Sequence, residues 1–195
     1  MIDRAGALPA GLASEPYPQR WLAAVVMVGA VLMDMIDITI VNVALPTIQR
    51  DLEASGTQLQ WVVSAYMLAF AATLIVAGSF GDVLGRKRVF LIGIALFGAA
   101  SLAAGLSQTP EELIAARVVQ GAAAAAIVPQ VLATFRAIFA GKERGQAFGM
   151  YGAILGFASA LGLVLGGLLT EADVFGWSWR TIFLINVPVA LVSFA

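Results

Sequence analysis

The sequence contains no cysteine and no histidine among its 195 residues. Without cysteine the chain can form no disulfide, no thiolate metal site and no cysteine nucleophile. Without histidine it lacks the side chain that usually titrates near neutral pH, so any proton chemistry falls to carboxylates. A Gly-x-x-x-x-Gly-Lys-Ser/Thr phosphate-binding loop is also missing, so that motif supplies no ATP hydrolysis. These absences leave no familiar catalytic constellation, and we expect neither an enzyme nor a bound cofactor or metal.

Charge is scarce as well. Charged residues make up 12% of the chain and hydrophobic residues 61%, and the mean hydropathy is +0.93. A soluble domain of this length would cover its core with more charge, so lipid must be part of the solvent. The net charge of −1 gives no argument for nucleic acid as a partner. The composition therefore predicts a protein whose surroundings are the lipid bilayer.

Apolar stretches separated by short polar breaks predict an all-α membrane protein with six transmembrane helices, because ~20 apolar residues cross the hydrocarbon core. A sixth stretch starts near Thr181 and is still apolar at Ala195, so we expect the sixth helix to be cut short. Residues 1–20 hold no apolar run and predict a tail, and residues 21–195 form one transmembrane unit. The first five stretches are expected at residues 21–45 (closed by Pro46), 59–80, 89–106, 113–139 and 147–169.

Lysine and arginine are distributed unevenly between the segments that connect these stretches. The connecting segments on one side of the membrane hold most of these residues, whereas those on the other side hold Arg50 and Arg180 beside several acidic residues. Basic residues favour the cytoplasmic side of a membrane, so the sequence predicts a multi-pass protein of the cell membrane with a cytoplasmic N-terminus. The residues assigned to the cytoplasmic side are Arg4, Arg20, Arg86, Lys87, Arg88, Arg136, Lys142 and Arg144.

Two carboxylates lie near the middle of the first stretch. Asp34 and Asp37 are three residues apart and share one helical face. Each carboxylate costs about 2.5–3.5 kcal/mol at the bilayer centre, so the pair is not expected there by chance. Two close carboxylates resist double ionisation, and a pair that shares a proton is a candidate proton carrier. A helix-anchoring hydrogen bond is the alternative, above all for Asp34. Asn42, on the shoulder of the same face, is a candidate for binding a substrate or another helix.

A third charge is expected inside the fourth stretch. Arg117 lies more than a turn from its start, and Gln120 follows one turn further on the same side. An isolated arginine here snorkels to the outer interface, whereas Gln120 beside it favours a polar lining that contacts substrate. We expect Arg117 to face the first helix and to set the proton affinity of Asp34 and Asp37.

The polar break after the second stretch begins at Gly78 and carries Asp82 before a basic triplet. Its glycines permit a tight turn, and the triplet anchors the turn to anionic headgroups. A merely basic turn would not need Asp82 or the glycine spacing. This break resembles the signature motif of the major facilitator superfamily, although Val83 stands where the family usually has a basic residue. The matching residues are Gly78, Asp82, Gly85, Arg86 and Lys87.

Three further segments narrow the resemblance to the fourteen-span drug:proton antiporter family. Order and spacing agree from about Trp21 to the end of the chain. The antiporter motif of the fifth helix keeps Gly162, Gly166 and Gly167 but has Leu163 where proline is expected, so transport is better supported than antiport. The similar segments are residues 36–46, 113–125 and 179–188.

The resemblance implies the N-terminal half of a transporter, with six helices in two inverted three-helix repeats. It would place Asp34, Asp37 and Arg117 on the cavity side, and Asp82 where it latches the cytoplasmic side against the other half. Such a half would need its missing C-terminal half or a second copy in order to transport.

The function that the resemblance implies is proton-coupled multidrug efflux, with drug-like or amphipathic small molecules and protons as partners and antibiotic resistance as the outcome. Two alternatives stay open. One is a facilitator or exporter of another small metabolite without strict proton antiport, which Leu163 keeps open. The other is a non-transporting membrane subunit that assembles with a complete transporter.

Overall fold

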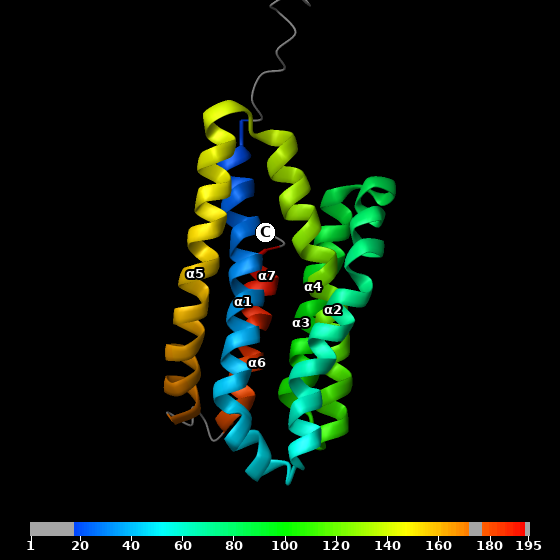
Figure 1. Cartoon of the computed structure of the whole chain (residues 1–195), viewed down its shortest axis with the longest axis vertical. Coiled ribbons are helices and arrows are strands. Elements are labelled where there is room, and N and C mark those ends of the chain that lie inside the picture. The colour runs from blue at the N-terminus through cyan, green and yellow to red at the C-terminus, as the bar shows by residue number, and fades with distance from the viewer. Residues whose placement is uncertain (1–17, 172–176, 194–195) are drawn as a thin grey trace, which may run out of the picture.

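The computed structural model describes residues 18–171 and 177–193, which are almost entirely helical. The prediction of an all-α fold is confirmed. The long helices run up and down beside one another (Figure 1), and α6 and α7 follow each other in line, separated by Ile185. The elements are α1 (Arg20–Asp51), α2 (Gly56–Leu84), α3 (Arg86–Leu106), α4 (Pro110–Ile138), α5 (Gly141–Glu171), the 3₁₀ turn η2 (Ser178–Arg180), α6 (Thr181–Leu184) and α7 (Asn186–Val192).

Five of these helices are long and apolar enough to cross a membrane, counting the described residues. The shortest of them, α3, has 21 residues and is therefore about 30 Å long, which matches the hydrocarbon core. A sixth apolar stretch, Ser178–Val192, is shorter. The predicted tail falls mostly on residues 1–17, and the predicted cut at Ala195 falls on residues 194–195. Both lie outside the described residues.

Most helices extend beyond the predicted stretches, and at the starts of α2 and α4 side-chain caps continue the helix into polar sequence. The predicted end of the first helix at Pro46 is wrong, since α1 runs through this proline to Asp51. At the start of α2, Ser55 and Gln58 form a reciprocal capping box. At the start of α4, the Thr109 hydroxyl accepts a hydrogen bond from the Glu112 backbone N–H. Hydropathy marks the apolar part of each helix, and the caps set its ends.

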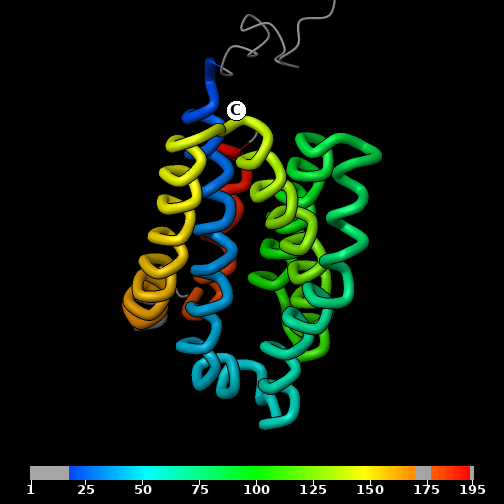
Figure 2. The backbone as a smooth tube through the Cα atoms, turned by 45° about the horizontal axis from the view of Figure 1, so that its top comes forward, coloured from blue at the N-terminus to red at the C-terminus, as the bar shows by residue number. Residues whose placement is uncertain are grey.

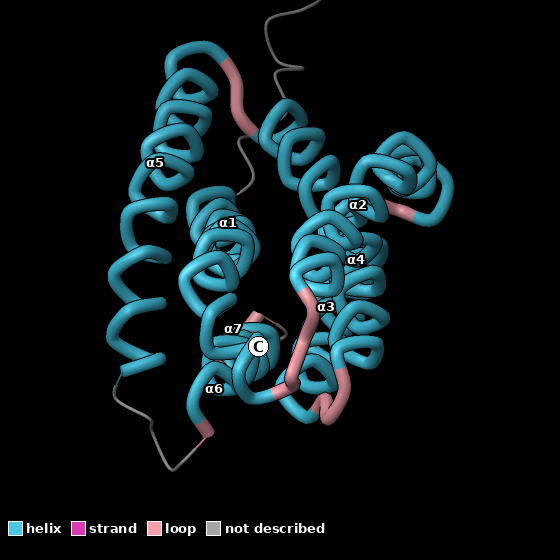
Figure 3. The backbone as a smooth tube through the Cα atoms, turned by 60° about the horizontal axis from the view of Figure 1, so that its bottom comes forward, coloured by secondary structure: helices cyan, strands magenta, loops and turns pink. Residues whose placement is uncertain are grey.

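The helices form two groups. Figure 2 shows α1 and α5 side by side on one side of the molecule and α2, α3 and α4 on the other. Figure 3, in which the bottom of the molecule comes forward, places α6 and α7 beside α1 on the side nearest α3, with which α7 is in contact. Two apolar clusters follow each other along the bundle. One surrounds Phe135 and includes Ala24 to Met33 of α1, and the other surrounds Trp179 and includes Ile40 to Leu52. Asp34 and Asp37 fall between them.

Glycines allow two of the helix pairs to approach closely. A Cβ atom added to Gly121 of α4 would lie 2.1 Å from the backbone oxygen of Tyr66 in α2. A Cβ atom on Gly162 or Gly166 of α5 would lie 2.7 Å or 2.9 Å from the Cβ atom of a residue in α1. In lipid, close backbone approach supplies packing that the hydrophobic effect does not. The helix-five glycines Gly162 and Gly166 therefore hold α5 against α1.

Candidate functional site

Polar side chains from four helices meet between the two apolar clusters, and we call this group the central network. Each member exposes at most 2% of its surface. Since an unpaired polar group in such surroundings is costly, its members must bond to one another. The central network consists of Asp37 from α1, Ser101 from α3, Arg117 and Gln120 from α4, and Asn186 from α7.

Asp37 accepts hydrogen bonds at both carboxylate oxygens. Its Oδ2 atom pairs with Nη1 of Arg117 in a fully buried ion pair. Its Oδ1 atom accepts from Nδ2 of Asn186 at 2.9 Å and from Nε2 of Gln120 at 3.3 Å. The Asp37 carboxylate thus has a cation and two amide donors from two other helices.

Arg117 is held on several sides. Nη1 also donates to Oε1 of Gln120 at 2.9 Å, and Nε donates to the backbone oxygen of Val62 at 3.2 Å. The guanidinium lies over the ring of Tyr66, 4.3 Å from its centroid. Arg117 therefore faces the first helix, as the sequence predicted. Its effect on the proton affinity of the carboxylates stays a prediction.

Ser101 joins the remaining members of the central network. Its hydroxyl accepts from Gln120 at 3.1 Å and from Asn186 at 2.9 Å, and it donates to the backbone oxygen of Phe183 at 2.9 Å. The sixth apolar segment is thereby tied directly to α3, and through Ser101 to Gln120 of α4.

Asp34 has a separate partner. Its Oδ1 atom accepts a hydrogen bond from the Tyr66 hydroxyl, and its buried Oδ2 atom has no hydrogen-bond partner among the described residues. In the described part of the chain no hydrogen bond joins Asp34 to Asp37. Asp34 thus bonds to α2 whereas Asp37 bonds to α4 and α7, and a proton shared by the two carboxylates stays a prediction.

The three charges are buried rather than lining an open surface. Asp34 and Asp37 are 0% exposed and Arg117 is 2% exposed. The surrounding helices enclose these side chains, and their expected position on the cavity side stays a prediction. Asn42 is exposed, and its Nδ2 atom donates to the backbone oxygen of Ile38 on the same helix at 2.8 Å. A substrate contact of Asn42 stays a prediction.

The predicted loop after the second stretch is almost entirely helical. Helix α2 includes Gly78 and Asp82 and ends at Leu84, so the prediction of a loop from Gly78 onward is wrong. Gly85 alone separates α2 from α3, and its φ of +92° is a conformation that favours glycine. Gly81 instead packs against the side chain of Gln130 in α4.

The residues around Gly85 are more exposed than the central network. Nη2 of Arg86 lies 3.5 Å from Oδ1 of Asp82, and the Asp82 side chain is 74% exposed. Nη1 of Arg86 donates to the backbone oxygen of Ala133 in α4 at 2.9 Å. Lys87 is exposed and, together with Arg86 and Phe90, helps to line a cavity of about 490 Å³ between α1, α3 and α4. The turn is thus anchored to α4 through Arg86.

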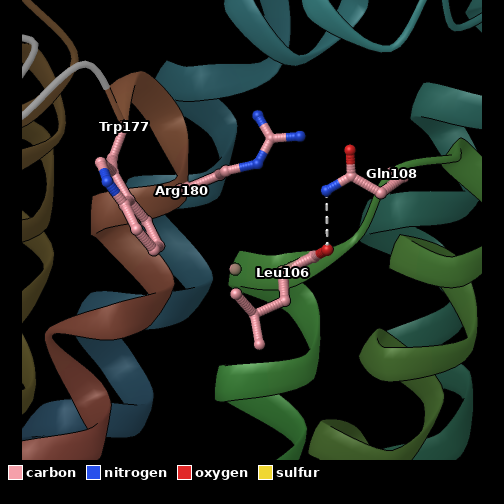
Figure 4. Close-up of a pocket in the computed structure, with 5 residues that line it drawn as sticks. Leu106, Gln108, Trp177 and Arg180 are labelled. Atoms are coloured by element: carbon pink, nitrogen blue, oxygen red, sulfur yellow. Dashed lines mark hydrogen bonds between the residues drawn. The ribbon is translucent and has the colours of Figure 1, made fainter.

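A smaller cavity of about 320 Å³ lies at the other end of the bundle, between the α3–α4 connection and the start of the sixth segment (Figure 4). Trp177 and Arg180 line it from one side. Nε2 of Gln108 donates to the Leu106 oxygen at 3.0 Å, and Nη2 of Arg180 donates to the Ser107 oxygen at 2.9 Å. These bonds fix the corner where the two segments meet.

Sequence reasoning missed the site roles of Tyr66, Ser101 and Asn186. Tyr66 and Asn186 each place a polar group inside an apolar stretch, which is a usable signal. Ser101 gave none, because serine in membrane helices commonly bonds to the backbone of its own helix.

The apolar helices and the buried charges between them define a membrane-embedded helical protein with ionisable groups at membrane depth. Residues 7–195 match the family described as Major Facilitator Superfamily. The chain belongs to this family and is a multi-pass membrane protein, as the sequence predicted.

Relatives agree with this assignment. The chain is 46% identical to the puromycin resistance protein pur8 of Streptomyces alboniger over 91% of its own length and 35% of the relative. It is 41% identical to the probable actinorhodin transporter of Streptomyces coelicolor over 97% of this chain and 35% of the relative. The methyl viologen resistance protein SmvA of Salmonella typhimurium is also 41% identical, over 89% of this chain and 34% of the relative. The chain thus spans about a third of the length of the curated relatives it matches.

A solved structure shares the fold. The bacterial homolog of the human lysosomal transporter Spinster, in an inward-facing and occupied conformation, superposes with a TM-score of 0.78 at 20% identity. The match covers 91% of this chain and 44% of that chain. The described helices therefore have the architecture of about half of such a transporter.

Proposed function

We propose that this chain forms the N-terminal half of a secondary active transporter that exports drug-like or amphipathic small molecules in exchange for protons. The buried Asp37–Arg117 ion pair, with Asp34 one turn away, carries the proposal. A buried ion pair adds little to stability, because desolvation offsets its attraction, so its presence in an apolar bundle favours a functional role. Ionisable residues at membrane depth commonly belong to proton or substrate pathways.

The relatives support the substrate class. Their names describe transport of actinorhodin and resistance to puromycin and methyl viologen, all of them small molecules. Since those proteins are about three times as long as this chain, the rest of their length would supply the second half. Access would then alternate as one half rocks against the other.

The distribution of basic residues supports a cytoplasmic N-terminus. In that orientation the turn at Gly85 lies on the cytoplasmic side, and the exposed Asp82 is available to a helix of the second half. This arrangement supports a latch at Asp82 that closes the cytoplasmic side.

A facilitator without strict proton antiport is the second candidate. The observation that favours it is Leu163, which is 58% exposed on a continuous α5 where the antiporter motif has proline. Proline in a helix interior removes a hydrogen bond and bends the helix. At this position α5 has leucine, so it lacks the bend that proline would cause.

The test is transport of ethidium into everted membrane vesicles with an acidic interior. Three proteins are compared: this chain alone, a longer protein in which this chain is continued by the remainder of pur8, and that longer protein with Asp37→Asn. Asp51→Asn, at the exposed end of the same helix, is the matched control. We expect transport only by the longer protein, lost with Asp37→Asn and kept with Asp51→Asn.

Two other results would contradict the proposal. Ethidium transport that does not depend on the proton gradient would favour the facilitator. No transport by a longer protein that is folded and inserted would favour a non-transporting subunit.

A further inference from the structure

The two acids of α1 differ in how they are paired. Asp37 accepts from one guanidinium and two amide groups. Asp34 is equally buried but accepts only the Tyr66 hydroxyl at Oδ1, among the described residues, and its Oδ2 atom is unpartnered. A buried carboxylate is tolerated when a cation and hydrogen-bond donors compensate its charge. Asp37 meets that condition and Asp34 does not.

We propose that Asp34, rather than Asp37, binds and releases the transported proton, and that Tyr66 is the residue that positions it. The proposal rests on the proton-coupled export proposed above. Tyr66 occupies Oδ1, so Oδ2 is the atom left to take the proton. One proton from water adds to Oδ2 to form the neutral acid, and the same proton returns to water on release.

The surroundings of Asp34 give this step a consequence for packing. The titratable and charged groups that interact electrostatically with it are Asp37 on its own helix, Tyr66 from α2, Arg117 from α4 and Tyr151 from α5. Arg117 lies over the Tyr66 ring while it pairs with Asp37. When Asp34 loses its proton, two carboxylates compete for this one guanidinium. Proton release at Asp34 therefore weakens the Asp37–Arg117 ion pair of the central network.

The test is infrared difference spectroscopy of the purified 195-residue chain in lipid nanodiscs across a pH titration. A neutral carboxylic acid has a C=O stretching band that the carboxylate lacks. We expect Asp34→Asn to remove one such titrating band and Asp37→Asn to keep it. Tyr66→Phe should move the band to higher wavenumber, because the hydroxyl no longer weakens the C=O bond at Oδ1. Tyr151→Phe is the matched control and should leave the band in place.

A titrating band that is lost with Asp37→Asn and kept with Asp34→Asn would overturn the assignment. If Asp37→Asn alone fails to fold, the double variant Asp37→Asn/Arg117→Gln removes both charges and is read in the same way. An unchanged band in Tyr66→Phe would overturn the role of Tyr66.

Transport separates this inference from the proposed function. Proton-dependent ethidium transport that survives Asp34→Asn in the longer protein would refute the inference and leave export standing. The Asp34 band in this chain, without proton-dependent transport by the longer protein, would support the proton site and refute export.

Discussion

Asp37 and Asp82 both belong to segments that resemble the family's motifs, yet their burial and their hydrogen-bond partners differ greatly. Asp37 is fully buried and has donors from α4 and α7. The Asp82 side chain is 74% exposed and lies 3.5 Å from Arg86 one turn away. A charge at membrane depth must be compensated by its own half, whereas a charge at a helix end is hydrated and can meet another helix. Loss of one partner in the central network should therefore destabilise this chain, whereas Asp82 should matter only once a second half is present.

The largest effect is expected from Arg117→Leu. This change leaves the Asp37 carboxylate buried without its cation, which costs about 3–5 kcal/mol in the free energy of unfolding. Thermal unfolding of the purified chain in detergent measures it as a large fall in melting temperature.

The matched control is the double variant Asp37→Leu/Arg117→Leu, which removes both charges. It should recover most of the loss, because apolar replacement of a whole buried pair is often neutral. A single variant as stable as the wild-type chain would contradict the expected cost of leaving Asp37 without its cation.

Gly121→Ala should have the next largest effect. The added Cβ atom would lie 2.1 Å from the backbone oxygen of Tyr66, so α4 must move away from α2. Overpacking of this kind costs about 1–3 kcal/mol. Gly145→Ala, whose Cβ atom meets nothing within 4 Å among the described residues, is the control and should not lower the melting temperature. Equal melting temperatures for the two variants would contradict the close approach.

Gly166→Ala should have a smaller effect. Its Cβ atom would lie 2.9 Å from the Cβ atom of Val43, and the α1–α5 contact can relax by a small shift. We expect a loss of about 1 kcal/mol, at the low end of overpacking costs. A Cβ atom on its neighbour Gly167 would meet nothing within 4 Å among the described residues. Gly167→Ala should therefore be neutral or slightly stabilising, because alanine favours helix by about 1 kcal/mol. The reverse order of stability would show that α5 packs on α1 through another face.

Asp82→Asn should change the stability of this chain least, by no more than about 0.5 kcal/mol, as for other surface substitutions. In the longer protein the same change should lower ethidium transport at least several-fold, because the latch would lose its charge. A fall in melting temperature as large as that of Arg117→Leu would remove the distinction between the two regions.

Much of this fold follows from hydropathy, because a lipid-embedded helix must be apolar over its whole spanning length. The helix ends could not be predicted from hydropathy. They depend on caps such as Ser55 and Thr109, and on α1 continuing through Pro46.

The charged members of the site were also predictable, since Asp34, Asp37 and Arg117 are costly in an apolar run. Their division into two bonding groups was not. That division depends on which helix packs against each carboxylate, and Tyr66 lies 32 residues from Asp34 in the sequence.

The assignment of the transported proton to the first helix is tested by proton release on substrate binding. Ethidium is added to the longer protein in weakly buffered detergent solution, and a pH-sensitive dye records protons released per protein. We predict release by the wild-type protein and none by the double variant Asp34→Asn/Asp37→Asn, with ethidium binding confirmed by its fluorescence. Undiminished proton release by the double variant would contradict a proton site on the first helix.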